Sequence, residues 1–106
     1  MAFLYIAEFA EIAVGPAGRV GQMPVEPPLA EQAIVNTGGN TQSAALNAAT
    51  RFVRLHADTI CAFKFGTNPT AIAAGATGTQ RLAAGQTEYH AVPKGSAFKV
   101  AVILST

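Results

Sequence analysis

RFVRLHADTICAFKFG, at residues 51–66, is the stretch that decides the fold class. Apolar residues take alternate positions on both sides of a central Asp58-Thr59 pair: Val53, Leu55 and Ala57, then Cys61, Phe63 and Phe65. Alternation with this period places one row of side chains on each face of a strand. Asp and Thr between two such runs are typical of a turn. The stretch therefore predicts a β-hairpin over residues 51–65.

A further pair of alternating runs lies in RLAAGQTEYHAVPKGSAFKVAVI, at residues 81–103. Proline and glycine at residues 93–96 indicate a turn between the runs. The run after this turn has a regular inward row made of Phe98, Val100, Val102 and Leu104. In the run before it, we expect Tyr89 to face the core, which leaves Glu88 and His90 together on the polar face. The segment is predicted to form the final hairpin.

Weaker signals fill the remainder of the chain after residue 30. EQAIV, at residues 31–35, is typical of a short strand. The alanine-rich residues that follow could begin a helix capped by Thr41 or Ser43. Residues 67–80 hold one weak strand at most. Short strands separated by turn signals about every 8–12 residues indicate an all-β fold, an antiparallel β-sandwich or barrel.

The N-terminal segment is different in composition. Residues 2–14 fit a strand and also a helix, but their aromatic and β-branched side chains favour extended structure. Residues 15–30 contain four prolines and three glycines, a density that neither a helix nor a central strand tolerates. We therefore divide the chain into an extended N-terminal arm or strap over residues 1–30 and a β-sandwich domain over residues 31–106.

The strap has two interpretations. It can be a linker or long surface loop, or it can be an arm that lies on a neighbouring subunit. As an arm it would be anchored by its exposed apolar side chains. These partner-interface candidates are Phe3, Leu4, Tyr5, Val25 and Leu29.

Composition limits the classes of partner. Charged residues make up 12% of the chain and the net charge is +1, so nucleic acid and anionic membranes are not expected as partners. A surface with so little charge is easily desolvated, which favours contact with other protein. Cys61 is the single cysteine, so no intrachain disulfide is possible. Glu8 and Glu11 interrupt the apolar opening, so we expect neither a signal peptide nor a membrane span, and folding in a cytoplasm.

Glu88 and His90 are the strongest candidates for chemistry, because a carboxylate beside an imidazole can transfer protons or bind a metal. A third ligand would have to come from His56 or Asp58. A cupin-like metal centre on a jelly roll uses about three histidines and a glutamate, and this chain has two histidines. We interpret Cys61 as a packed small hydrophobe. We therefore assign no catalytic, cofactor-binding or metal-binding residue and expect no enzymatic activity.

Two segments resemble small virion proteins of tailed bacteriophages: ALNAATRFVRLHADTICAFKFGTNPTA and RLAAGQTEYHAVPKGSAFKVAVI, which together cover roughly residues 46–103. The shared features are the FVRLHAD strand, FGTNPTA after its partner, and the spacing of RLAAGQTEY, VPKG and KVAVI. Some head decoration, or cement, proteins of this size are jelly-roll β-sandwiches that clamp neighbouring capsid subunits. The resemblance therefore implies a jelly-roll-like sandwich with a structural role in the virion.

The resemblance also implies partners and a location. The partners would be the phage major capsid protein and further copies of this chain, as a homodimer or homotrimer, with no cofactor. The protein would be made in the cytoplasm of the bacterial host and would sit on the capsid exterior. One alternative is a tail, neck or baseplate adaptor or a carbohydrate-binding β-sandwich, although a chain with no tryptophan and two tyrosines offers few rings for sugar stacking. A further alternative is a cupin-like metal-binding jelly roll that uses His56, Glu88 and His90.

Overall fold

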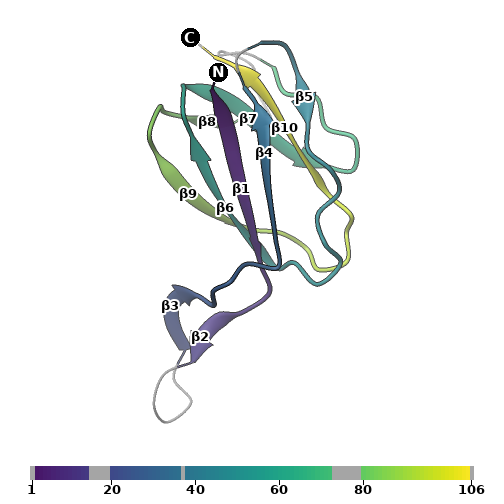
Figure 1. The fold of residues 1–106 in the computed structure, drawn as a ribbon. Coiled ribbons are helices and arrows are strands. Elements are labelled where there is room, and N and C mark those ends of the chain that lie inside the picture. The colour runs from purple at the N-terminus through teal and green to yellow at the C-terminus, as the bar shows by residue number, and fades with distance from the viewer. Residues whose placement is uncertain (1, 15–19, 37, 73–79, 106) are drawn as a thin grey trace.

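The computed structural model describes residues 2–14, 20–36, 38–72 and 80–105, and every regular element in these ranges is a β-strand. Two four-stranded antiparallel sheets pack face to face, and a two-stranded ribbon projects from one end of this sandwich (Figure 1). The expected all-β antiparallel sandwich is confirmed. Within the described ranges there is no helix that could cross a membrane.

Sheet 1 has the strand order β4 (Ala30–Val35), β1 (Phe3–Phe9), β6 (Phe52–Ala57) and β9 (Thr87–Ala91). β1 pairs with β4 on one side and with β6 on the other, and Tyr5 lies opposite both Ala33 and His56. β6 pairs in turn with β9, where Arg54 lies opposite Tyr89. These registers determine which side chains are neighbours across the face of the sheet.

Sheet 2 has the strand order β5 (Thr41–Gln42), β10 (Lys99–Leu104), β7 (Cys61–Gly66) and β8 (Gln80–Leu82). The core lies between the two sheets and consists of the inward rows of their strands. Its fully buried members are Leu4, Ile6, Val53, Leu55, Ala57, Cys61, Phe63, Leu82, Val100 and Val102. Full burial of a large apolar side chain stabilises a fold by about 1.5–3 kcal/mol, so these rows stabilise the sandwich.

The two predicted hairpins do not form, although their strands do. β6 lies in sheet 1 and β7 in sheet 2, so the connection at residues 58–60 crosses between the sheets, and the same is true of β9 and β10. The two apolar rows of residues 51–66 therefore face each other across the core. Alternation specifies which face of a strand is buried, but it does not specify the partner strand. The pairing prediction was wrong for this reason.

Both ends of the chain bind the connection at residues 58–60. The backbone N–H of Asp58 donates to the carbonyl of Phe3 over 3.1 Å, and the Asp58 carboxylate accepts from the Phe3 N–H over 3.1 Å. The N–H of Ser105 donates to the carbonyl of Ile60 over 3.2 Å. β1 therefore begins beside the point where β10 ends, as the adjacent N and C labels in Figure 1 show.

The boundary expected at residue 30 does not coincide with the edge of the sandwich. β1 is a central strand, with Leu4 and Ile6 no more than 1% exposed, so residues 3–9 are part of the domain and not of an arm. The segment that leaves the sandwich lies between β1 and β4. It contains the ribbon strands β2 (Ile12–Val14) and β3 (Val20–Pro24), which pair with each other and with no other described strand. Backbone pairing to β4 and β6 holds β1 in place, and the sequence of β1 contains no sign of those partners.

The helix considered after Thr41 does not form. The backbone N–H of Ser43 donates to the carbonyl of Val100 over 2.8 Å, and the Ser43 hydroxyl accepts from the Val100 N–H over 2.9 Å. The N–H of Leu46 donates to the carbonyl of Phe98 over 2.8 Å. Polar groups that a helix would use internally are therefore used in contacts with β10 and the residue before it.

A buried carboxylate ties the same segment to β1. Glu8 is 1% exposed. Its Oε1 accepts hydrogen bonds from the Asn47 backbone N–H at 2.7 Å and from the Thr50 hydroxyl at 2.8 Å. The Gln32 amide donates to Oε2 over 3.4 Å. These donors replace the water that an ionised carboxylate loses on burial.

Candidate functional site

The outer face of sheet 1, which points away from the core, presents two rows of side chains across the strands. One row runs through Ala33, Tyr5, His56 and Thr87, and the next through Glu31, Ala7, Arg54 and Tyr89. The strands alternate their side chains between the two faces, so the inward neighbours of these residues fill the core. The two rows bring together groups from four strands that are far apart in the sequence.

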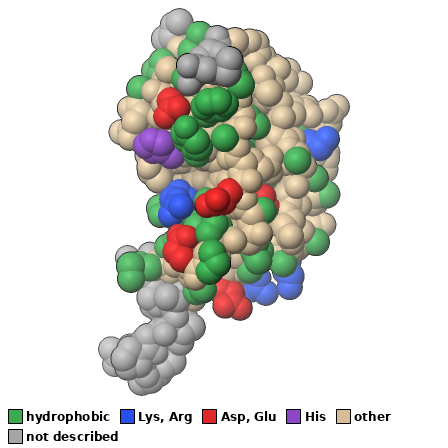
Figure 2. Space-filling model, viewed as in Figure 1, with side chains coloured by type: hydrophobic (Ala, Val, Ile, Leu, Met, Phe, Trp, Pro, Cys, Tyr) green, Lys and Arg blue, Asp and Glu red, His purple; other side chains and the backbone are tan. Residues whose placement is uncertain are grey.

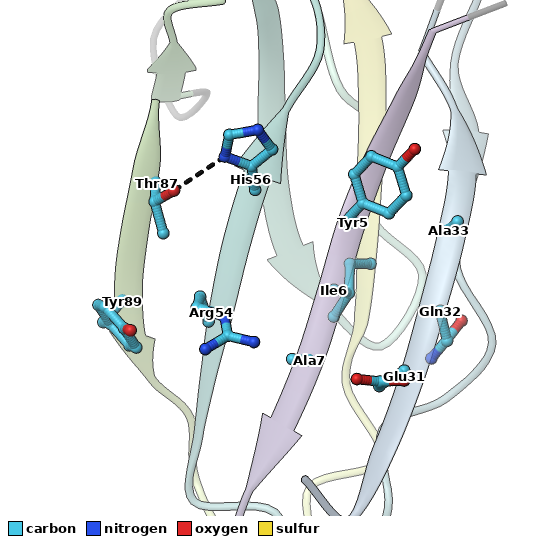
Figure 3. A pocket seen from close by; sticks show the side chains of 10 residues that line it. All are labelled: Tyr5, Ile6, Ala7, Glu31, Gln32, Ala33, Arg54, His56, Thr87 and Tyr89. Atoms are coloured by element: carbon cyan, nitrogen blue, oxygen red, sulfur yellow. Dashed lines mark hydrogen bonds between the residues drawn. The ribbon is translucent and has the colours of Figure 1, made fainter. Parts of the chain in front are cut away.

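These rows line a hollow of about 810 Å³, which we call the outer-face groove (Figure 3). The side chains of Ala7 and Ala33 are small, and each lies beside larger side chains of the same face: Ala7 beside Glu31 and Arg54, and Ala33 beside Tyr5. Tyr5 and Tyr89 are 45% and 53% exposed, so each ring presents much of its surface to solvent. Figure 2 shows hydrophobic side chains together with histidine, basic and acidic side chains on this side of the molecule.

Aromatic and imidazole rings follow one another along the groove. The ring centroids of Phe3 and Tyr5 are 6.0 Å apart, and those of Tyr5 and His56 are 6.4 Å apart with an interplanar angle of 37°. The Nδ1 of His56 lies 2.8 Å from the Thr87 hydroxyl, a hydrogen bond whose direction depends on the imidazole tautomer. This bond fixes the orientation of the imidazole ring beside Tyr5.

Arg54 connects the groove to the segment that follows the ribbon. Its guanidinium carbon lies 5.4 Å from the centroid of the Phe9 ring, and its Nη1 lies 3.4 Å from the Glu26 carboxylate. Phe9 in turn stacks on Phe52, with 5.2 Å between ring centroids. The ion pair is partly exposed and contributes at most about 1 kcal/mol. Its structural effect is to orient the guanidinium along the face of the sheet.

A further hollow, of about 530 Å³, adjoins the groove on the side of the ribbon. Arg54 and Tyr89 line both hollows. Ile12 and Met23 of the ribbon line the second hollow together with Phe52 of β6. The concave surface therefore continues from the outer face of sheet 1 towards the ribbon.

Exposed apolar side chains occur in two pairs near the ribbon: Ile12 and Met23 line the hollow beside Phe52, and Val25 and Leu29 line a smaller hollow beside Phe9. Ile12, Met23, Val25 and Leu29 are 43%, 70%, 42% and 46% exposed; we call these four residues the ribbon-base patch. The backbone here is held by hydrogen bonds from Val25 N–H to the Glu11 carbonyl over 3.2 Å and from Leu29 N–H to the Glu8 carbonyl over 2.7 Å. The patch is therefore fixed to the end of β1.

The five proposed partner-interface residues do not form one surface. Leu4 is fully buried in the core, so it cannot contact a partner, and its selection as an anchor was wrong. Phe3 and Tyr5 lie on the outer face of sheet 1. Val25 and Leu29 belong to the ribbon-base patch. The alternation of β1 explains the division, because successive side chains point to opposite faces.

Tyr89 points outward, contrary to our expectation, and Glu88 and His90 take the inner side of β9. In the register, Glu88 lies opposite Leu55 and His90 opposite Val53, which both belong to the core row. β9 is an edge strand of sheet 1, so its inward side chains reach the margin of the core, where half-buried polar groups remain partly solvated. A strand of this kind need not place its most apolar row inside, and the sequence contains no signal for its edge position.

His90 and Glu88 form a pair at this margin. The Nε2 of His90 lies 3.1 Å from the Glu88 carboxylate, and its ring centroid lies 5.2 Å from that of Phe63 and 5.6 Å from that of Phe65. His56 lies on the opposite face of sheet 1, so the three residues of the cupin-like alternative are not brought together. No group of three or more His, Cys, Asp or Glu side chains suited to a metal occurs in the described part of the chain.

Cys61 lies inside the core, at the start of β7. Burial raises the pKa of its thiol above the ordinary value, and a hydrogen bond with Asn36 offsets part of this rise. Asn36 is itself fully buried and exchanges hydrogen bonds with Thr59. The thiol is therefore a packed group with little thiolate character at neutral pH.

Comparison of the chain with protein-family models, with curated proteins and with solved structures finds no match.

Proposed function

We propose that this protein is a structural component of a phage virion, which binds the capsid lattice and stabilises it by bridging major capsid subunits. The observation that carries the proposal is the ribbon-base patch, whose four large apolar side chains are 42–70% exposed and line two hollows near the ribbon, two in each. Contiguous exposed apolar groups are typical of surfaces that contact other protein. The choice of a phage virion as the assembly comes from the resemblance described in the sequence analysis, over roughly residues 46–103, and is part of the proposal.

The size of the patch bears on how such binding would work. Full burial of a large apolar side chain contributes about 1.5–3 kcal/mol, so covering these half-exposed groups contributes about 4 kcal/mol in total. One copy bound only through the patch would therefore bind weakly. A homodimer or homotrimer on a symmetric lattice engages several patches at once, and each additional contact is then intramolecular. This is how a small chain with few charges can bind a capsid tightly.

The strand order supports a jelly-roll description of the sandwich. A jelly roll with eight strands lettered B to I has sheets in the orders B-I-D-G and C-H-E-F. We assign the letters B to H to strands β4 to β10 in chain order and the letter I to β1. With these letters, sheet 1 has the order B-I-D-G and sheet 2 has the order C-H-E-F. Phe3 and Ser105 both bind the connection at residues 58–60, so the end of β10 lies close to the start of β1. In a jelly roll the chain connects strands H and I at this position. The proposed fold is thus a jelly roll whose last strand comes first in the chain.

Two measurements test the proposed function. The first is mass spectrometry of purified virions of the phage that carries the gene, in which we expect this chain in many copies per particle. The second compares two surface variants in binding to particles that lack the protein. Met23→Ser with Leu29→Ser should weaken binding by about tenfold or more, since the lost burial is worth about 1.4 kcal/mol or more.

The matched control is Ile72→Ser, which alters an exposed apolar side chain outside the patch, 51% exposed. It should bind particles as the unaltered protein does. Circular dichroism and urea unfolding establish that both variants are folded. Absence of the chain from virions would refute the structural function. Full occupancy by the folded patch variant would refute the patch as the contact.

A further inference from the structure

We propose that the outer-face groove binds a neutral oligosaccharide. The chain has two tyrosines, and both lie in this groove, one on β1 and one on β9. They are 45% and 53% exposed. A tyrosine combines an apolar ring face with a polar hydroxyl, which suits a ligand that has both an apolar face and hydrated polar groups. A pyranose ring is such a ligand, because its C–H groups form an apolar face and its hydroxyls surround it.

The registers give the separation of the two tyrosines. β6 lies between their strands, with His56 opposite Tyr5 and Arg54 opposite Tyr89. Neighbouring strands are about 4.8 Å apart and residues rise about 3.4 Å along a strand, so the two Cα positions are about 12 Å apart. A single sugar ring cannot reach both side chains from one position. The geometry therefore favours a short oligosaccharide over a monosaccharide.

Hydrogen-bonding groups of both kinds lie between the rings. Ala7 has Glu31 opposite it on β4 and Arg54 opposite it on β6, so a carboxylate acceptor and a guanidinium donor flank its small side chain (Figure 3). Sugar hydroxyls both donate and accept, so they can use both groups. Arg54 is paired with Glu26 and Glu31 lies beside it, so the groove has no excess of positive charge, which disfavours an anionic polymer and favours a neutral ligand.

A peptide strand is a poorer occupant, because it would need free backbone groups in the sheet. β1 and β6 are interior strands, and each pairs with a neighbour on both sides. The floor of the groove therefore offers side chains and not backbone hydrogen bonds. A nucleic acid is also a poorer occupant, since Arg54 faces the carboxylate of Glu26 at 3.4 Å and no basic stripe is present among the residues that line the groove.

The test uses the isolated protein, so its outcome does not depend on the virion assignment. Isotope-labelled protein is titrated with cellohexaose, maltohexaose and chitohexaose up to about 5 mM, a range that detects binding free energies near 4 kcal/mol. We expect at least one hexasaccharide to shift the nuclear magnetic resonance signals of Tyr5, His56 and Tyr89. Tyr89→Ala should weaken that binding about tenfold or more, and Tyr5→Phe, which keeps the ring, should change it by less than about threefold.

Ile72→Ala is the matched control and should leave binding unchanged. Tyr89 lies on an edge strand and is 53% exposed, so its replacement is compatible with folding. The proposal is overturned if none of the three sugars shifts the groove signals, or if binding survives Tyr89→Ala. It is also overturned if the same signals move with protein concentration alone, since the face would then be a contact between two copies of the chain.

Discussion

Removal of the buried carboxylate of Glu8 should destabilise the sandwich severely. Its Oε1 accepts two short hydrogen bonds, from the Asn47 N–H at 2.7 Å and the Thr50 hydroxyl at 2.8 Å. Hydrogen bonds to a charged group contribute about 1.5–3 kcal/mol each. Glu8→Ala removes both bonds and leaves two donors without their acceptor, which costs about 1–3 kcal/mol more for each donor. It also removes the cost of burying a charge, which is several kcal/mol and offsets part of this loss. We expect a net loss of about 3–4 kcal/mol in the free energy of unfolding.

The measurement is urea unfolding at neutral pH, followed by circular dichroism. With a slope of about 1–1.5 kcal/mol per molar urea for a domain of this size, the midpoint should fall by about 2–4 M. Glu8→Gln keeps an acceptor oxygen but loses the charge, and we expect a smaller loss of about 1–2 kcal/mol. Thr50→Val removes one donor and should cost about as much. The double variant should lose less than the sum of Glu8→Ala and Thr50→Val, because the two groups share one bond.

Glu31→Ala is the control for the loss of a carboxylate. Glu31 lies on the neighbouring strand β4 and is exposed, so its replacement should change stability by less than about 0.5 kcal/mol. If Glu8→Ala were as stable as this control, desolvation would cancel the hydrogen bonds. The reasoning that Glu8 holds the segment after Ser43 against β1 would then be refuted.

Three other perturbations test the backbone, the buried thiol and the topology. Gly95→Ala should cost about 1 kcal/mol, because Gly95 has a φ of +75°. Gly38 has equally open space and no positive φ, so Gly38→Ala should cost nothing or stabilise the fold. Thermal unfolding compares the two variants, and equal effects would contradict the left-handed backbone at Gly95. Burial raises the pKa of the Cys61 thiol, so the thiol should contribute fully to stability below about pH 9, where the unfolded thiol keeps its proton. Above that pH the free energy of unfolding should fall by up to about 1.4 kcal/mol for each pH unit. Urea midpoints at about pH 8 and pH 10 should show this decline in the unaltered protein more than in Cys61→Ala, and identical slopes would refute it. In a permuted chain that begins at Pro28, a linker of about six Gly and Ser residues joins the original ends. This chain should unfold cooperatively, with a free energy of unfolding lowered by less than about 2 kcal/mol. Loss of the cooperative transition would contradict the jelly-roll order.

The strands were largely predictable from local pattern. The alternation in residues 51–66 and near the C-terminus matches β6, β7, β9 and β10, and EQAIV lies within β4. Side chains that alternate in polarity bury one face in any sandwich, so this information is present in each segment alone. The strand preference of residues 2–14 was also correct, since β1 and β2 lie there. The position of β1 in the centre of a sheet was not predictable, because it depends on β4 and β6.

The candidate groove was the least predictable feature. Tyr5 and Tyr89 are separated by most of the chain, and they reach one face only because β1 and β9 both pair with β6. The outward orientation of Tyr89 depends on the register of β9 against β6, in which Glu88 faces the core side. A shift of one residue in that register would exchange the two faces. The edge position of β9 permits its less apolar row to point inward.

From its sequence alone, this protein is an all-β chain with strands at defined positions, because polarity that alternates over a few residues is sufficient to make one side of a strand apolar. The assignment of strands to sheets, the burial of Glu8 and the meeting of the tyrosines were decided by the tertiary structure. Each of these depends on hydrogen bonds and packing between segments far apart in the chain. These interactions act between strands, so their energies cannot be predicted from the sequence of one segment alone.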